Sequence, residues 1–179
     1  MIEVKNLTKR FDGFTALNGL TMTVPTGSVY GLVGPNGAGK STIIRHITGV
    51  YRPDSGEVLI GGEPVFENPP VKARIACIPD DLSCHAGTTI RELKTFYKGL
   101  YPAFSDERFT ALADIFKLDQ RQPLRRFSKG MQKQAAFWLA ICTQPDYLVL
   151  DEPVDGLDPV MRKQVWSVIL EDVATRGTT

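Results

Sequence analysis

One stretch of the sequence reads Gly34-Pro35-Asn36-Gly37-Ala38-Gly39-Lys40-Ser41, which matches the phosphate-loop pattern G-x-x-x-x-G-K-[ST] in full. An apolar run over residues 28–33, typical of a buried strand, precedes it, and a helical pattern over residues 41–48 follows it. The alternative is a flexible glycine loop that happens to precede a lysine. Such a loop would not require a strand before it and a helix after it. The whole arrangement therefore favours a loop that binds phosphate.

Each residue type in this loop has a chemical role. Glycines let the backbone fold around phosphate oxygens, and the helix that follows turns its positive N-terminal end toward the anion. We expect Lys40 to reach the β- and γ-phosphates of a nucleotide, and the Ser41 hydroxyl to bind Mg²⁺. The predicted nucleotide contacts are the loop and the first helical turn, namely Gly34, Pro35, Asn36, Gly37, Ala38, Gly39, Lys40, Ser41 and Thr42.

Two carboxylates, Asp151 and Glu152, follow an apolar strand predicted over residues 147–150. In a phosphate-loop fold, the end of such a strand is where a metal-orienting carboxylate lies. We expect Asp151 to hold Mg²⁺ through a water, and Glu152 to polarise the attacking water as a general base. Taken alone, these carboxylates would more simply be an acidic cap after a strand. The phosphate loop upstream favours the catalytic interpretation.

Strand and helix patterns alternate along the rest of the chain. Residues 1–33 have the composition of β structure, and the further predicted elements are strands over 57–60 and 75–78, helical periodicity over 88–127, and helices over 131–143 and 160–174. This order predicts an α/β core that is interrupted by a helical insert. At 179 residues, the chain is long enough for one such domain.

Composition excludes several classes of function. With 42% apolar residues, 23% charged residues and a net charge of +1, the chain has no electrostatic reason to bind nucleic acid. No stretch approaches the roughly 20 apolar residues that span a bilayer, and the N-terminus lacks an apolar signal core, so we expect a cytoplasmic protein. Cys77, Cys84 and Cys142 show no C-x-x-C spacing, and Cys84 beside His85 offers too few ligands for a structural zinc.

In this order the motifs resemble those of the ABC ATPases. Residues 127–132, Phe-Ser-Lys-Gly-Met-Gln, are similar to a variant of the LSGGQ signature of that family. Residues 153–159 resemble the D-loop, which follows the family's Walker B motif. The resemblance covers the chain from Ile2 to Thr179. Its details, which include Pro79-Asp80-Asp81, resemble the ATPase subunits of bacterial ABC-2-type exporters, in the group named for acetoin utilisation (YtrB-like).

The resemblance implies a phosphate-loop NTPase fold with an N-terminal antiparallel β subdomain, residues 1–179 forming one ATPase domain. It implies that Phe11 stacks on the adenine of ATP, and that Ser128 and Gly130 bind the γ-phosphate held by a second subunit, so that two copies enclose two ATP molecules. Because Ser128 and Gly130 precede a predicted helix, they form a second anion-binding helix terminus. Ser128 can serve as the N-cap of that helix at the same time.

One departure from the family pattern concerns the metal. Most of the family has glutamine after the strand that corresponds to residues 75–78, and here Asp80 takes that place. A charged, shorter side chain could bind Mg²⁺ more strongly but reach less far. We therefore expect Asp80 to be a third metal ligand beside Ser41 and Asp151. A turn or helix-capping aspartate is the alternative.

A second departure concerns the family's switch histidine. That residue lies on a strand beyond the D-loop helix, and this chain ends at Thr179 before it; neither His46 nor His85 can take its place. The resemblance thus indicates C-terminal truncation just before a strand that lies between the phosphate-loop strand and strand 147–150. Losing that strand would leave both neighbours without pairing partners. We expect the 179 residues alone to be poorly stable.

The helical insert, residues 88–127, is where the family contacts its membrane partner. The candidate contact residues are aromatic and lie at helical spacing: Phe96, Tyr97, Tyr101 and Phe104. Aromatic residues at this spacing are more often part of a core, and that interpretation stays open.

The leading function is therefore an Mg-dependent ATPase that drives an integral membrane permease, at the inner face of the membrane, as a homo- or heterodimer. A soluble ABC ATPase acting on ribosomes or DNA is the first alternative, but the chain has one cassette and no sustained heptads between Lys40 and Ser128. The second alternative is a switch that closes on ATP and hydrolyses it weakly, because glutamine is replaced by Asp80 and the switch histidine is absent. Glu152 argues against this alternative for a longer protein, whereas weak or absent hydrolysis is the expectation for the 179 residues alone.

Overall fold

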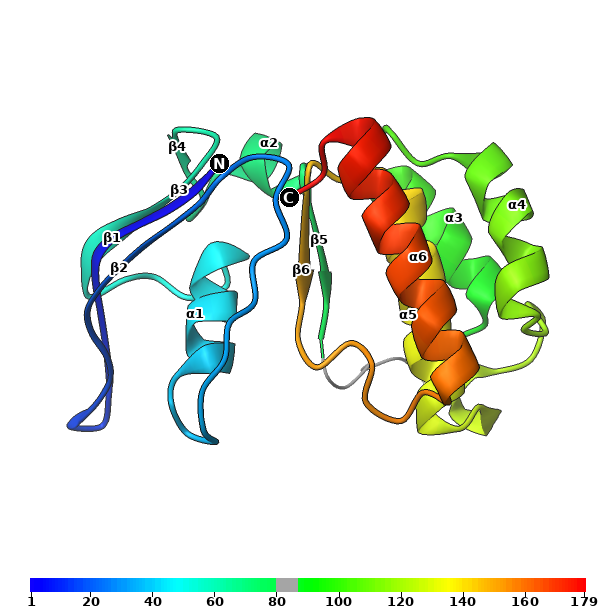
Figure 1. Cartoon of the computed structure of the whole chain (residues 1–179), viewed down its shortest axis with the longest axis horizontal. Helices are drawn as coiled ribbons and strands as arrows, with labels where there is room; N and C mark the ends of the chain where they lie inside the picture. The colour runs from blue at the N-terminus through cyan, green and yellow to red at the C-terminus, as the bar shows by residue number, and fades with distance from the viewer. Residues whose placement is uncertain (80–86) are drawn as a thin grey trace. The chain divides into compact units, whose positions relative to one another are not determined.

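The computed structural model describes residues 1–79 and 87–179. The chain forms two compact units (Figure 1). Unit 1 contains Met1–Ile75 and Val173–Thr179, and unit 2 contains Ala76–Asp172. Asp80, the expected third metal ligand, lies outside the described residues, as do Cys84 and His85.

Unit 1 is built on an antiparallel sheet in the order β2-β1-β3-β4. The strands are β1 (Ile2–Phe11), β2 (Phe14–Val24), β3 (Ser55–Ile60) and β4 (Glu63–Pro64). Ile2 pairs with Val24 on one side of β1 and with Ile60 on the other. Ile2, Val4 and Leu7 of β1 are buried, and the alternation of a half-buried strand is interrupted by a register shift between Val4 and Leu7. The N-terminal antiparallel β subdomain is thus confirmed.

Two helices accompany this sheet, α1 (Lys40–Ile47) and the short α2 (Pro69–Lys72). Helix α1 begins one residue before the predicted range, and α2 was not predicted. The side chains of Ile43, His46 and Ile47 bury one face of α1, and the helix contacts β2 and β3. This packing fixes the helix whose N-terminus carries the glycine-rich loop.

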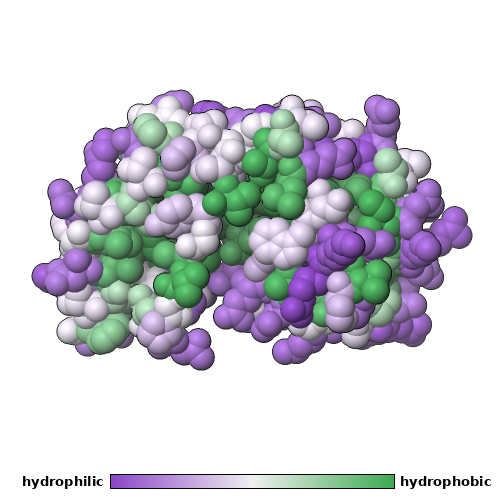
Figure 2. Space-filling model, viewed as in Figure 1, coloured by the Kyte–Doolittle hydropathy of each residue, from purple (hydrophilic) through white to green (hydrophobic). Residues whose placement is uncertain are grey.

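The apolar run over residues 28–33 is irregular, so the prediction of a buried strand was wrong. Among the described residues the two sheets are β2-β1-β3-β4 and β5-β6, and neither includes this run. Val33 is 95% exposed, and apolar side chains reach the surface of unit 1 on the face along which the run passes (Figures 1 and 2). The physical reason is that a strand needs a paired neighbour to satisfy its N–H and C=O groups.

Unit 2 combines a two-stranded sheet with helices. Its elements are β5 (Ile75–Ile78, whose first residue falls in unit 1), α3 (Ile90–Leu100), α4 (Asp106–Phe116), the 3-10 turn η1 (Leu124–Arg126), α5 (Lys129–Cys142), β6 (Tyr147–Leu150) and α6 (Pro159–Arg176, whose end falls in unit 1). The helical insert is thus observed, and α5 starts earlier than predicted. Strand β6 pairs with β5, so the expectation that both neighbours of the absent strand would lack a pairing partner was wrong for β6. Residues 28–33, the other neighbour, belong to neither sheet of the described residues, as expected.

Helix α5 forms the centre of unit 2. Every residue from Gln134 to Cys142 is buried, which explains the unbroken apolar run in the sequence. The Trp138 indole N–H donates to the Phe109 carbonyl at 3.0 Å, and the two rings stack with centroids 4.3 Å apart. A buried tryptophan with its N–H satisfied ties α4 firmly to α5.

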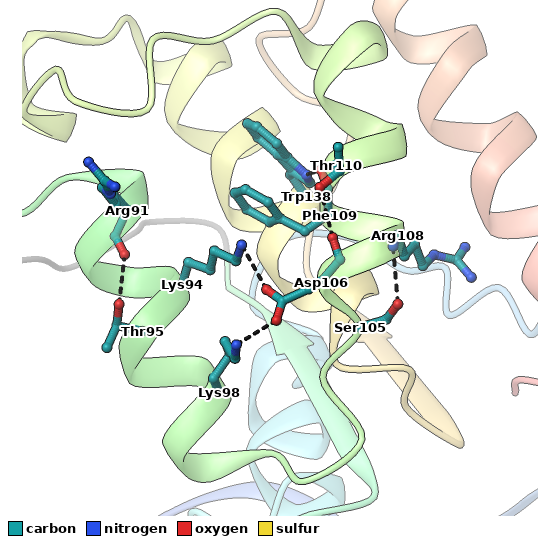
Figure 3. Close-up of polar contacts among 10 residues, drawn as sticks. All are labelled: Arg91, Lys94, Thr95, Lys98, Ser105, Asp106, Arg108, Phe109, Thr110 and Trp138. Carbon is teal, nitrogen blue, oxygen red and sulfur yellow. Dashed lines mark hydrogen bonds and ion pairs between the residues drawn. The ribbon is translucent and has the colours of Figure 1, made fainter.

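A charged cluster joins α3 to α4 at the edge of unit 2. Asp106, in the first turn of α4, lies between Lys94 and Lys98 of α3 (Figure 3). Lys94 Nζ lies 2.7 Å from the Asp106 carboxylate and 4.3 Å from the centre of the Phe109 ring. Hydrogen bonds from the two lysines lower the pKa of Asp106 below its ordinary value. These contacts order the start of α4 against α3.

Candidate functional site

The glycine-rich loop takes a backbone path that only glycine allows at its end. Gly37 and Gly39 have φ angles of 81° and 89°, in the region that side chains disfavour. A Cβ atom on Gly39 would lie 2.9 Å from the Ala16 carbonyl oxygen and 2.9 Å from Leu17 Cδ2. The loop therefore closes directly against β2, and glycine at position 39 is required both by conformation and by space.

Lys40 is held inside this loop. Its ammonium group donates to the carbonyl oxygens of Gly34 at 2.8 Å and Pro35 at 2.9 Å, and the Ala38 N–H donates to the Pro35 carbonyl at 3.2 Å. Because Lys40 is also the first residue of α1, the loop brings together a cation and a positive helix end. This combination of charge suits a phosphate group.

The first turn of α1 places Ser41 at the exposed surface and Thr42 partly buried. His46, one turn later, is 1% exposed, and its Nδ1 lies 2.8 Å from the Thr42 carbonyl oxygen. Burial lowers the pKa of His46, so the ring is neutral at pH 7 and donates from Nδ1. Sequence reasoning gave His46 no role, and the structure shows that it fixes the turn that carries Ser41 and Thr42.

Phe11 ends β1 at the hairpin turn into β2. Its ring is 37% exposed and lies edge-on to the Tyr51 ring, with centroids 5.4 Å apart. Lys9 Nζ is 5.4 Å from the centre of the Phe11 ring and 2.9 Å from the Asp54 carboxylate. These contacts hold Phe11 at the hairpin end of β1 with its side chain partly exposed, and stacking on adenine stays a prediction.

Asp151 and Glu152 follow β6 directly, as predicted. The Asp151 N–H donates to the Ile78 carbonyl at 3.0 Å, which extends the pairing with β5 by one residue. Burial, with a smaller effect of the Asp151 charge, raises the pKa of the Cys77 thiol to about 11, so this thiol is protonated and unreactive. Glu152 is exposed and has a φ angle of 48°. The chain therefore turns sharply at the residue expected to act as base.

The signature residues begin helix α5. The Ser128 hydroxyl accepts from the Met131 N–H at 3.2 Å, so the N-cap interpretation is confirmed. Gly130 lies directly against Gly156 of the D-loop: a Cβ atom on Gly130 would overlap the Gly156 carbonyl oxygen. Gln132 Nε2 also donates to the Phe127 carbonyl at 3.0 Å. Within unit 2, the signature segment thus packs directly against the D-loop.

The structure places the predicted site residues in two groups. The loop from Gly34 to Thr42 and Phe11 belong to unit 1, whereas Ser128, Gly130, Asp151 and Glu152 belong to unit 2. Over residues 1–79 and 87–179, no group of three or more His, Cys, Asp or Glu side chains could hold a metal. The expected Mg²⁺ ligands Ser41 and Asp151 carry a hydroxyl and a carboxylate, and oxygen donors of this kind are those that Mg²⁺ prefers.

The four aromatic residues predicted to contact a membrane partner are not fully buried. Phe96 is 60% exposed, and Tyr97, Tyr101 and Phe104 are half-buried, so the interpretation of Phe96 as a core residue was wrong. Tyr97 stacks on Tyr101 with ring centroids 5.7 Å apart. The helical spacing in the sequence correctly predicted a helix through Phe96 and Tyr97. At Phe96, however, no other described element covers the helix face. Among the described residues no helix has the length and apolarity to cross a membrane.

Comparison with known proteins agrees with these features. A family model described as ABC transporter matches residues 17–155. The ABC transporter ATP-binding protein YtrB of Bacillus subtilis is 32% identical over 179 residues, 100% of this chain and 61% of that protein. The daunorubicin/doxorubicin resistance ATP-binding protein DrrA of Streptomyces peucetius is 38% identical over 184 residues, 99% of this chain and 56% of that protein.

A solved structure described as the ATP binding subunit of an ABC transporter superposes with a TM-score of 0.89 at 28% identity, over 97% of this chain and 75% of that one. The chain thus spans less than two thirds of the length of both curated relatives. The family and the fold predicted from the sequence agree with these matches.

Proposed function

The chain belongs to the ABC transporter family of ATP-binding proteins, and from this premise we propose that it binds Mg-ATP and hydrolyses it as the motor subunit of a membrane transporter. The observation that carries the proposal is the Lys40 ammonium, held by two loop carbonyls at the N-terminus of α1. A cation fixed at this place can exchange those carbonyls for the β- and γ-phosphates. Residues Gly34 to Thr42 supply the remaining phosphate contacts.

We propose that four side chains take part in the chemistry besides Lys40. Ser41 and Asp151 hold Mg²⁺, and Asp80 is a further candidate ligand. When bound, Mg²⁺ neutralises charge on the phosphate oxygens. Glu152 orients the attacking water and accepts its proton as the water oxygen bonds to the γ-phosphorus. The bond from that phosphorus to the oxygen of the β-phosphate breaks in the same reaction, so that ADP and phosphate leave. Glu152 suits this role because it is exposed at the end of a paired strand.

We propose that two such cassettes act together, with residues 1–179 of each forming one domain and residues 88–127 its helical insert. Ser128 caps α5, and the N–H groups of that first turn form a second anion-binding terminus in unit 2. One triphosphate needs only one such cradle, so the second suits the ATP of a partner copy. The partner can be an identical chain or a related subunit.

A permease is the partner we propose for α3. Phe96 presents an exposed aromatic side chain on the insert that the family resemblance assigns to this contact. Exposed aromatic residues on one helix face suit an apolar segment of another protein. In this arrangement the protein lies on the cytoplasmic face of the membrane through its permease and does not bind nucleic acid.

Removal of the metal tests the proposed chemistry. Turnover of ATP, measured as phosphate release, is expected to fall to the uncatalysed background when EDTA is added and to return on addition of excess Mg²⁺. The physical reason is that both charge neutralisation and water placement depend on the metal. ATP turnover that persists in EDTA would contradict the proposal. ATP binding without turnover in Mg²⁺ would instead support a nucleotide-gated switch.

A further inference from the structure

The backbone of Glu152 is held by a lysine from another element. Glu152 has a φ angle of 48°, a left-handed conformation that non-glycine residues rarely adopt. Its carbonyl oxygen accepts from Lys133 Nζ at 2.8 Å and from the Asp155 N–H at 3.3 Å. The charged donor makes the shorter of the two bonds, and bonds of this type are stronger than neutral ones.

Lys133 is well placed to hold this turn because its own position is fixed. It lies on α5 one turn after Gly130, and it is half-buried. The start of α5 is capped by Ser128 and packs through Gly130 on the Gly156 backbone. The segment from Glu152 to Gly156 is therefore anchored to α5 at both ends, by the Lys133 ammonium and by the Gly130 contact.

We propose that Lys133 is a positioning residue for ATP hydrolysis: it holds the left-handed turn at Glu152, and so sets the direction of the carboxylate that acts on water. The inference rests on the proposed function, because it takes Glu152 to be the base. It adds a link that the signature and D-loop motifs do not contain, since Lys133 lies outside the residues expected to touch nucleotide. A change at the start of α5 would reach Glu152 through this bond.

The test compares three variants with the full wild-type chain. Lys133→Met keeps the aliphatic stem and removes the donor, and Lys133→Arg keeps a charged donor. Lys163→Met removes an exposed lysine of α6 that lies outside the signature and D-loop segments. Lys133→Met is expected to lower kcat by about 10- to 100-fold, since small errors in placing a catalytic group have effects of this size. The KM for ATP is expected to stay unchanged, because the nucleotide contacts keep their residues.

Lys133→Arg is expected to recover most of the turnover, and Lys163→Met to match the wild type. A role limited to packing would leave kcat of Lys133→Met near that of the wild type. Hydrogen exchange gives a second readout, in which the amides of Asp155 and Leu157, bonded within this turn, exchange faster in Lys133→Met than in Lys133→Arg.

Two results would overturn the inference, namely unchanged kcat in Lys133→Met or unchanged exchange at these amides. Glu152→Gln, measured in parallel, separates this failure from failure of the proposed function. If Glu152→Gln is inactive while Lys133→Met behaves as wild type, only the inference fails. If Glu152→Gln keeps full turnover, Glu152 is not the base, and both the proposed chemistry and the inference fail.

Discussion

Replacing Glu152 with glutamine is expected to lower the kcat of ATP hydrolysis by about 10²- to 10⁴-fold, the usual contribution of a general base. Glutamine is nearly the same size and can still orient a water, but it cannot accept a proton. The phosphate loop is untouched, so the affinity for ATP is expected to be unchanged. Phosphate release measures the first quantity, and equilibrium titration with a fluorescent ATP analogue measures the second.

The matched control is Glu107→Gln, an exposed carboxylate near the start of α4. It makes the same chemical change in the same unit, away from β6, and is expected to keep the turnover of the wild type. Loss of activity in both variants would indicate a general charge effect. Wild-type turnover in Glu152→Gln would show that another group takes the proton.

Replacing Arg108 with methionine is expected to lower the free energy of unfolding of unit 2 by about 3–5 kcal/mol, the usual cost of removing one partner from a buried ion pair. Arg108 of α4 pairs with Asp172 of α6, and the Asp172 side chain is 1% exposed. Without the guanidinium, a buried carboxylate loses its cation, and α4 and α6 lose a charged link. Urea unfolding followed by tryptophan fluorescence measures the effect, because Trp138 is buried in the same unit.

Arg91→Met is the control for this experiment, since Arg91 is an exposed arginine of α3. Its unfolding free energy is expected to stay within about 0.5 kcal/mol of the wild type, as for most surface substitutions. A loss in Arg108→Met that is no larger than in Arg91→Met would mean that the pair with Asp172 adds nothing to stability.

The features predicted well from sequence are those carried by neighbouring residues. The phosphate loop, the carboxylates after β6 and the cap at Ser128 each depend on a local pattern of residue types. Periodicity was equally informative for α1, α5 and α6, since one apolar face or a fully apolar run decides whether a helix packs. The insert was recognised as helical for the same reason.

The features that were missed depend on distant partners. Residues 28–33 have the composition of a buried strand, but composition does not supply the neighbour that a strand must pair with. Lys133 and Glu152 are 19 residues apart, and nothing in their spacing shows that one holds the other. The contact of Gly130 with Gly156 was hidden for the same reason, although both glycines lie in recognised motifs. Phe96 was ambiguous because helical spacing does not say what covers the face.

The molar mass of Glu152→Gln in the presence of Mg-ATP tests the central claim most directly, that two of these cassettes enclose ATP between them. Light scattering is expected to give the mass of one chain without nucleotide and of two chains with ATP, because blocked hydrolysis preserves the closed pair. With ADP, the single-chain mass is expected to remain, since the γ-phosphate that Ser128 and Gly130 would bind is absent. A single-chain mass at saturating ATP, in a protein shown to bind it, would contradict the account.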